Sequence, residues 1–480
     1  MTEPCDLSAV EARRLIGTKR LSPVELLASC LARIEAVNPR LNAVVAMDEG
    51  RARKDAQRAE AAVMAGGPLG PLHGLPIGIK DLTETAGLRT TYGSPIYRDH
   101  VPDQDERIVA DIRAAGGIVL AKTNTPEFGA GANTTNAVYG PTGNPFDPAR
   151  TCGGSSGGSA VALATSMLPL CTGSDLGGSL RTPAAYCGVV GFRPSPGLVP
   201  HELRVHGWGP LPVQGPMGRD VADTRLLLSV MAADDPRDPL ARPVDGAAFR
   251  EGRPVDLAGL RAAWSVDLGF ATIDRRIAET FRARIGAIAP AFKSCAEAEL
   301  PDMGGAGEAF AVLRAVGFVG AHRERYERRR DLLGPNVAAN VEQGLGLSLA
   351  DVARALAEQT RIYRGFQRLF EDIDLLIAPT AAVPPFPHGQ PYVGEIDGRP
   401  MPTYFHWLAP VYGLTLTTHP VAALPCGLDP TGTPFGLQLC GPRGGDRFVL
   451  DAAAALEAYL AAEPALARPL PDLAALRDGS

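Results

Sequence analysis

The feature that most restricts the fold of this sequence is a glycine- and serine-rich stretch between residues 152 and 184. It contains two loops that share the tripeptide Gly-Gly-Ser, which starts at Gly153 in the first loop and 24 positions later, at Gly177, in the second. Residues 160–167 between the two loops are good helix formers without glycine or proline, so the first loop is predicted at a helix N-terminus. Free N–H groups and the helix dipole favour negative charge there, which suits a site where charge develops during a reaction.

Three other interpretations of this stretch fit less well. A phosphate-binding loop needs Lys-Ser or Lys-Thr after the glycines, and none follows. Gly153–Gly157 fits the G-x-S-x-G nucleophile elbow with Ser155 as nucleophile, but 147–151 is a poor strand candidate and no histidine lies in a recognisable catalytic context. Simple turn formation explains one such loop, but not two copies with Asp175 and Arg181 flanking the second serine.

Along the rest of the chain, helical and extended patterns alternate. Residues 1–65 read as a mainly helical segment, with a capping box starting at Ser22. The run 76–80 reads as a buried strand that ends on Lys80, and residues from about 245 to 375 read as a more helical, variable region over the core. We expect residues 1–480 to form a single α/β domain with a large mixed central β-sheet flanked by helices.

Composition excludes several classes of protein. The net charge is −6 without a long basic run, so nucleic-acid binding is not expected, and no apolar stretch reaches the length of roughly 18 residues that a membrane span needs. Residues 1–6 do not resemble a signal peptide. The eight cysteines form no C-x-x-C pair, which is typical of reduced thiols in a cytoplasmic protein and argues against structural zinc. We expect no metal and no organic cofactor.

The second loop carries the most specific signal in the sequence. From Gly173 to Ala184 it reads G-S-D-L-G-G-S-L-R-T-P-A, and further matching segments lie at 78–81, 122–128, 144–147, 152–159, 187–194 and 436–438. Together they resemble the amidase signature family over most of the chain, most weakly across residues 230–375. The resemblance implies the amidase signature fold and hydrolysis of amide carbon–nitrogen bonds.

The resemblance also implies a Ser-Ser-Lys catalytic triad. Ser179 matches the nucleophile, Ser155 the bridging serine that follows a cis peptide bond, and Lys80 the base. Lysine is a base only when its neutral form is favoured, and burial at the end of an apolar strand would favour it. The family places the oxyanion hole on the backbone N–H groups of residues in the second loop, here Leu176, Gly177, Gly178 and Ser179.

Supporting roles fall to residues around the triad. We expect Asp175 and Arg181 to hold the nucleophile loop through hydrogen bonds, and Ser156 and Ser159 to cap or pack the helix. By alignment with the family, Gly129, Ala130 and Gly131 line the acyl site. Candidate pocket aromatics are Phe128, Trp208, Tyr404, Phe405 and Trp407, and the proline-rich segment after Pro379 is a candidate lid or pocket wall.

Two functions remain open on this basis. The favoured one is a stand-alone amidase, monomeric or homodimeric, that acts on small-molecule amides, with aryl amides foremost and a range extending to carbamates (urethanes) and esters. The alternative is the ammonia-supplying glutaminase subunit of a tRNA-dependent amidotransferase, a branch that usually has threonine where this chain has Leu176. A lipid-amide hydrolase would usually carry a membrane-binding helix, and a non-catalytic relative would not need Lys80, Ser155 and Ser179 together.

Overall fold

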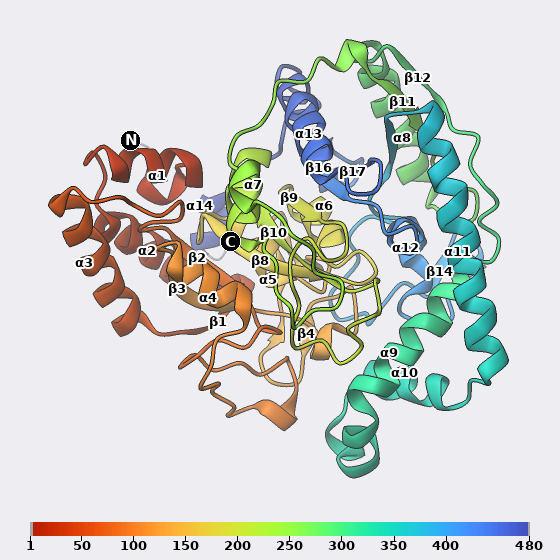
Figure 1. Ribbon diagram of the computed structural model, residues 1–480, viewed down its shortest axis with the longest axis horizontal. Helices are drawn as coiled ribbons and strands as arrows, with labels where there is room; N and C mark the ends of the chain where they lie inside the picture. The colour runs from red at the N-terminus through yellow and green to blue at the C-terminus, as the bar shows by residue number, and fades with distance from the viewer. Residues whose placement is uncertain (1–2, 479–480) are drawn as a thin grey trace.

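The computed structural model describes residues 3–478 and is built around a central β-sheet (Figure 1). The sheet has 11 strands in the order β1-β3-β2-β8-β10-β9-β16-β17-β13-β11-β12. In that order the strands are Val44–Met47, Ile118–Thr123, Pro76–Lys80, Leu170–Asp175, Val213–Gly218, Val190–Arg193, Val421–Leu428, Pro434–Cys440, Leu375–Pro379, Arg261–Trp264 and Ser294–Glu297. This confirms the predicted α/β class with a large mixed sheet.

Both parallel and antiparallel pairs occur in the sheet. β2 pairs in parallel with β3 and β8, and β11 pairs in parallel with β13 and β12, while the other neighbours are antiparallel. In the β2–β8 pair, Ile77 lies opposite Leu170 and Gly78 opposite Cys171. Parallel strands end at the same edge, so Lys80 at the end of β2 lies beside the end of β8.

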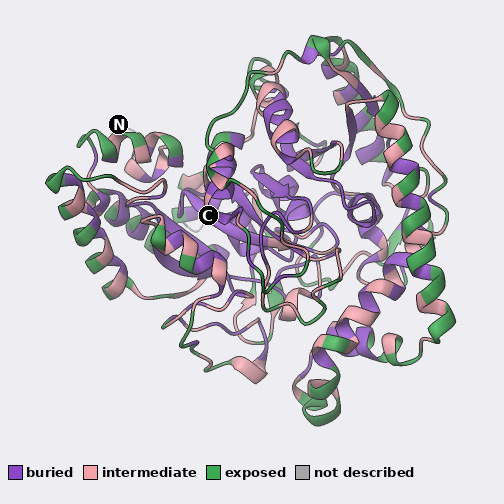
Figure 2. Cartoon of the chain, in the orientation of Figure 1, coloured by how far each residue is buried: buried purple, intermediate pink, exposed green. Residues whose placement is uncertain are grey.

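Neighbouring side chains of β3 pack into different hydrophobic clusters on the two faces of the sheet. Side chains alternate between faces along each strand. Val119 therefore packs in the cluster that includes residues of α4, α7 and α13, whereas its neighbours Ile118 and Leu120 pack in the cluster around α2, α3 and α5. Ile77 and Ile79 of β2 belong to the first cluster. Figure 2 shows these central strands buried beneath helices whose outer faces are exposed.

Helices cover the sheet and extend to both sides of it. In Figure 1, α1–α3 lie at one end of the molecule and α9–α11 at the other. The α-helices are α1 Ala9–Gly17, α2 Pro23–Leu41, α3 Glu49–Ala65, α4 Arg107–Ala114, α5 Gly157–Ala164, α6 Arg181–Cys187, α7 Val221–Met231, α8 Arg275–Ile288, α9 Ala306–Arg328, α10 Pro335–Leu345, α11 Leu349–Asp372, α12 Ala409–Leu416, α13 Asp446–Ala461 and α14 Leu473–Asp478.

Sequence-based expectations for local structure are confirmed at α2 and α5. The capping box of α2 is present, with the Ser22 hydroxyl and the Glu25 carboxylate each accepting a backbone N–H bond at the start of the helix. The first Gly/Ser loop does lead into a helix, because α5 begins at Gly157. The region 245–375 contains α8, α9, α10 and α11, and it also contributes β11 and β12, whose four-residue length gives too weak an alternation to be recognised from the sequence.

One strand was wrongly dismissed. Asp147–Thr151 forms β7, which pairs with β6 (Gly143–Asn144) in a two-stranded sheet. Pro148 is compatible with this strand because a two-stranded ribbon has outer edges where a missing N–H costs no ladder bond. Two further small sheets pair β4 (Thr135–Asn136) with β5 (Gly140–Pro141) and β14 (Glu395–Ile396) with β15 (Arg399–Pro400).

No helix within residues 3–478 is both long enough and apolar enough to span a bilayer. The eight cysteines are all unpaired thiols, and all but Cys295 are buried.

Candidate active site

Lys80 lies at the end of β2 and is 1% exposed. Ile77 and Ile79 point into one hydrophobic cluster, so alternation turns Lys80 to the opposite face, where α5 begins. Its Nζ donates to the hydroxyl oxygens of Ser155 at 2.7 Å, Ser156 at 2.9 Å and Ser174 at 2.9 Å. The lysine is thus held by three hydroxyl groups instead of a carboxylate.

Burial controls the charge of Lys80. Removal from water disfavours the ammonium form and lowers the pKa to about 7, against the opposing effect of the Asp175 carboxylate. With this pKa, about half of the Lys80 side chains are neutral at pH 7 and able to accept a proton.

Ser155 connects Lys80 to the pocket. The Gly154–Ser155 peptide bond is cis, as the family resemblance implied, and Ser155 lies one residue before the N-cap of α5. Gly129 closes over it from the other side: a β-carbon on this glycine would lie 3.3 Å from Ser155 Oγ, and the glycine has φ +73°. A larger residue at position 129 would therefore crowd the hydroxyl and strain the backbone.

Ser179 lies in the second loop, just before α6, and is half-buried. It lines the same pocket as Ser155. In the part of the chain that the structure describes, the Ser179 hydroxyl makes no hydrogen bond, while its carbonyl accepts from the Ser156 N–H. The Lys80–Ser155 contact is therefore preformed and a Ser155–Ser179 contact is not.

The backbone N–H groups of the second loop differ in their availability. Gly178 N–H donates to Asp175 Oδ1 at 2.9 Å, so this member of the predicted oxyanion hole is already engaged. Within the described residues, no hydrogen bond engages the N–H groups of Leu176, Gly177 or Ser179. The expectation for Gly178 is thus corrected, because the loop needs that donor for its own turn.

Asp175 and Arg181 make the contacts of residues that hold the loop. The Arg181 guanidinium and the Asp175 carboxylate form a bidentate ion pair with two hydrogen bonds of 3.0 and 3.1 Å. Arg193 adds a third contact to Asp175 at 3.2 Å. Burial acts to raise the pKa of Asp175, but the two guanidinium charges outweigh it and hold the pKa well below its usual value. Arg181 also donates to Val411, Gln438 and Thr415, which ties the loop to α12 and β17.

The two further serines behave differently from each other. Ser156 occupies the N-cap position of α5, yet its side chain makes no capping bond and instead bonds Lys80. Of the two roles predicted for it, capping or packing, the capping role is therefore wrong, since the buried amine of Lys80 takes its hydroxyl. Ser159 donates to the Thr172 carbonyl at 2.8 Å, as expected of a packing residue.

The pocket in front of Ser155 and Ser179 has a volume of about 800 Å³, part of it open to solvent. Of the predicted lining residues, Gly129, Gly131, Phe128, Tyr404 and Phe405 are present. Lining residues that the sequence did not indicate are Leu82, Ser174, His201, Pro212, Val213, Phe310, Arg314, Phe318 and Leu408.

Three predicted pocket residues lie elsewhere. Ala130 packs against a cluster with Phe318 and Val337. Trp407 is 1% exposed and packs against Phe386 in the core, whereas Trp208 is 79% exposed on the surface. Residue type alone could not separate these cases, because a tryptophan serves a core, a surface or a pocket equally well.

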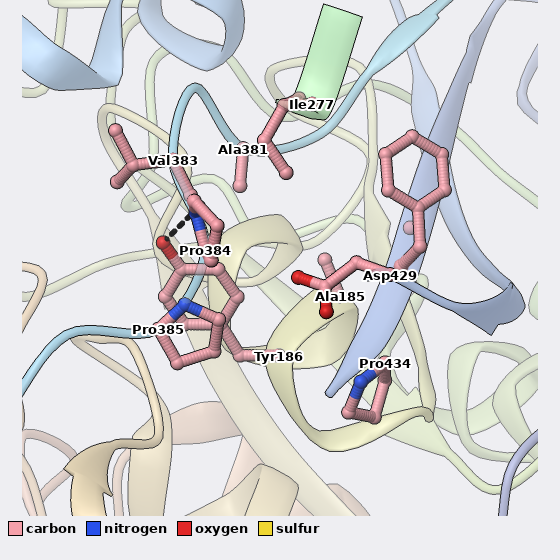
Figure 3. A pocket seen from close by; sticks show the side chains of 11 residues that line it. Ala185, Tyr186, Ile277, Ala381, Val383, Pro384, Pro385, Asp429 and Pro434 are labelled. Atoms are coloured by element: carbon pink, nitrogen blue, oxygen red, sulfur yellow. Dashed lines mark hydrogen bonds between the residues drawn. The ribbon is translucent and has the colours of Figure 1, made fainter. Parts of the chain in front are cut away.

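The proline-rich segment lines a different and smaller pocket. Val383, Pro384 and Pro385 face Tyr186 and Asp429 around a space of about 220 Å³, part of it open to solvent, that no triad residue lines (Figure 3). The Tyr186 hydroxyl donates to the Val383 carbonyl at 2.7 Å. Of the two expectations, a lid or a pocket wall, the structure shows a wall, but it belongs to this second pocket and not to the pocket of Ser155 and Ser179.

Metal-binding side chains are not gathered at the triad. Among the described residues, the group of carboxylates and thiols close enough to share an ion is Glu3, Cys5 and Asp6. Both carboxylates pair with Arg33, at 2.8 and 3.1 Å, and none of the three residues lines the pocket.

Comparison with known proteins agrees with this geometry. The Amidase family model matches residues 25–450. An acylamidase from Rhodococcus erythropolis is 34% identical over 94% of this chain and 95% of its own length. A glutamyl-tRNA(Gln) amidotransferase subunit from Anaeromyxobacter dehalogenans is also 34% identical, over 97% of this chain and 99% of its own length. A bacterial aryl acylamidase structure of the amidase signature family superimposes with a TM-score of 0.87 and 28% identity over 99% of both chains.

The chain therefore belongs to the amidase signature family. It is a hydrolase that acts on amide carbon–nitrogen bonds.

Proposed function

We propose that this protein is a stand-alone amidase that hydrolyses small-molecule amides, aryl amides foremost, through an acyl-enzyme on Ser179. The observation that carries the proposal is the 2.7 Å contact between Lys80 Nζ and Ser155 Oγ, at the edge of the pocket that Ser179 also lines. A buried lysine with a pKa of about 7 supports its role as the base.

In the proposed acylation step, neutral Lys80 takes the proton of Ser155 as Ser155 takes the proton of Ser179. Ser179 Oγ then attacks the carbonyl carbon and the carbonyl π electrons move to oxygen. In this mechanism the unengaged N–H groups of Leu176, Gly177 and Ser179 donate to that oxyanion. The carbon–nitrogen bond breaks as the relay returns its proton to the leaving amine.

Deacylation uses the same proton relay, with water in place of Ser179 as the nucleophile and Ser179 as the leaving group. A water molecule gives its proton to the relay and attacks the acyl carbon. The Ser179 Oγ–carbon bond breaks, Ser179 regains its proton, and the acid product leaves. Every proton passes through Lys80 and Ser155, so this mechanism assigns no step to a metal or organic cofactor.

The shape of the pocket supports aryl substrates. Phe128, Phe310, Phe318, Tyr404 and Phe405 supply aromatic walls against which an aryl group can pack. Carbamates (urethanes) and esters present a similar carbonyl to Ser179, so we include them in the range of substrates. Because its cysteines are unpaired thiols, we propose a cytoplasmic location for the protein. We propose that it acts as a monomer or homodimer.

The second candidate is the glutaminase subunit of a tRNA-dependent amidotransferase. It is favoured by the 34% identity to one component of such an enzyme over nearly the whole chain. Leu176, at a position where that branch usually carries threonine, counts against it.

A panel of nitroanilides and glutamine, given to the purified protein alone, separates the two. We expect anilide turnover by the wild type, and a loss of at least about a thousandfold in Ser179→Ala, since removal of a nucleophile abolishes the acyl-enzyme route. Circular dichroism checks that the variant is folded. No anilide turnover, with glutaminase activity that depends on added partner subunits, would overturn the proposal in favour of the alternative.

A further inference from the structure

Arg314 in α9 is a buried cation on the wall of the active-site pocket without a carboxylate partner. It is 3% exposed and lines the pocket that holds Ser155 and Ser179. Among the described residues, no acidic side chain forms an ion pair with it, although most buried arginines of this protein, such as Arg181 and Arg193, have one. Burial of an unpaired charge is unfavourable unless another group compensates it.

The hydrogen-bonding capacity of Arg314 is only partly used. Nη1 donates to the Tyr404 hydroxyl at 2.7 Å and Nη2 to Gln343 Oε1 at 3.3 Å. Nε has no partner within the described chain, and a guanidinium carries five N–H groups in all. The guanidinium is stacked 3.6 Å from the centre of the Phe405 ring, which fixes its plane.

Tyr404 adds a second donor at the same place. Its hydroxyl oxygen accepts from Arg314 Nη1 and from Asn340 Nδ2 at 2.9 Å, which uses both lone pairs. The phenolic proton is therefore left to donate, and Tyr404 itself lines the pocket. Arg314 and Tyr404 together present a positive charge and donors of both N–H and O–H type.

No acid in the described pocket wall neutralises this pair. Asp175 is the acidic residue that lines the pocket, and its carboxylate is engaged by Arg181 and Arg193. Lys80, with its pKa of about 7, adds further positive charge as the pH falls. The positive charge in and beside the pocket therefore favours binding of a negatively charged ligand.

The position of Arg314 fixes where such a charge would lie on the substrate. Phe310 is one helical turn earlier in α9, and its ring edge lies 2.8 Å from the position that a β-carbon on Gly177 would take. One turn of α-helix advances about 5–6 Å, roughly the length of an aryl ring. An aromatic group bound beside Phe310 could therefore join the reacting carbonyl near Gly177 to an anion at Arg314.

We propose that Arg314 and Tyr404 form a carboxylate-recognition subsite, so that the preferred substrates are aryl amides with a carboxylate on the ring. This rests on the proposed amidase function and specifies its substrate class. The carboxylate would accept from the guanidinium and the phenol, and Phe310 and Phe405 would contact the ring.

The proposed carboxylate subsite is tested with matched pairs of substrates in which a neutral carboxamide replaces the carboxylate. On the amine side, 4-acetamidobenzoate is compared with 4-acetamidobenzamide. On the acyl side, 4-(phenylcarbamoyl)benzoate is compared with its terminal carboxamide. For at least one pair we expect the wild type to favour the carboxylate by about tenfold or more in kcat/KM, because charge-assisted hydrogen bonds discriminate to that extent.

Three variants connect that ratio to the residues. Arg314→Met should bring the ratio to about 1, and Tyr404→Phe should reduce it severalfold while keeping the ring. Arg323→Met removes an exposed arginine of the same helix, paired with Glu327, and should leave the ratio unchanged. Thermal unfolding checks that each variant is folded. If Arg314→Met does not fold, the test relies on the ratio measured for Tyr404→Phe.

A ratio of 1 or below for both pairs in the wild type, or an unchanged ratio in Arg314→Met and Tyr404→Phe, would overturn the subsite. Failure of the amidase function is distinguishable, because the neutral amides then also remain intact. In that case, calorimetric titration of Ser179→Ala with terephthalate and with neutral terephthalamide still tests the subsite. Tighter binding of terephthalate supports it, and equal or weaker binding refutes it.

Discussion

Two buried lysines on neighbouring strands, Lys80 of β2 and Lys122 of β3, have similar burial but different surroundings. Burial lowers the pKa of Lys80 to about 7 and that of Lys122 to about 8. Lys80 Nζ bonds three serine hydroxyls, and two of these serines, Ser155 and Ser174, line the pocket. Lys122 Nζ bonds the Thr83 carbonyl and the Thr85 hydroxyl, away from the pocket, and the negative charges of Asp81 and Glu106 favour its protonated form.

A depressed pKa therefore does not by itself define a base. A base also needs a proton donor that leads to the substrate. Ser155 supplies that donor for Lys80. Of the partners of Lys122, the Thr83 carbonyl has no proton to give, and the Thr85 hydroxyl donates its proton to that carbonyl. We assign proton transfer to Lys80 and a structural role to Lys122.

The largest expected effect is that of Lys80→Met. This variant removes the base and should lower kcat/KM for an anilide by about 10²–10⁴-fold, the usual contribution of a general base. Lys122→Met is the matched control and should stay within about tenfold of the wild type. Steady-state kinetics on both variants make the comparison, and equal losses would show that the two lysines do not differ in role.

The pH dependence of kcat/KM is the next effect in size. The neutral form of Lys80 is active, so activity should fall as the pH drops through about 7, by about tenfold per pH unit below it. Lys122→Met should keep this acidic limb in place. A flat profile between about pH 5 and 8 would contradict a base with this pKa.

Lys122→Met should affect stability more than catalysis. The Thr83 carbonyl and the Thr85 hydroxyl lose their buried donor, which costs about 1–3 kcal/mol in the free energy of unfolding. Urea denaturation followed by circular dichroism measures this. No loss of stability would mean that the contacts of Lys122 contribute nothing to the fold.

The smallest expected effect is that of Ser174→Ala. It removes one of the three acceptors of the Lys80 amine at a cost of about 1 kcal/mol, so kcat/KM should fall about fivefold. Since a hydroxyl acceptor favours the ammonium form, the acidic limb should also move to lower pH. A pH profile of the variant tests both, and a shift to higher pH would be inconsistent with the contact.

The sequence predicted the parts of the site that local patterns encode. Lys80 ends a buried strand and Ser155 precedes a helix, and both features are visible in a few consecutive residues. The sequence around Asp175 likewise encodes a loop in which the ion-pair partner of Asp175, Arg181, lies only six residues further along the chain.

The remaining parts depend on tertiary contacts. Ser174 reaches Lys80 only because β8 pairs in parallel with β2, and the occupied N–H of Gly178 depends on the orientation of the Asp175 carboxylate. Arg314 comes from the region of weakest family resemblance, where nothing in the sequence indicates which helix face meets the pocket. Trp208 was misplaced because residue type alone does not show whether a tryptophan lies in a pocket or on the surface.

Trapping of the acyl-enzyme separates the two lysines at the chemical step itself. Wild type, Lys80→Met and Lys122→Met are mixed with a 4-nitrophenyl ester, quenched in acid, digested and mapped by mass spectrometry. We expect an acyl group on Ser179 that forms rapidly in the wild type and Lys122→Met, and at least about a hundredfold more slowly in Lys80→Met. An acyl group on Ser155 instead, or equal rates in all three proteins, would contradict the roles assigned to Ser179 and Lys80.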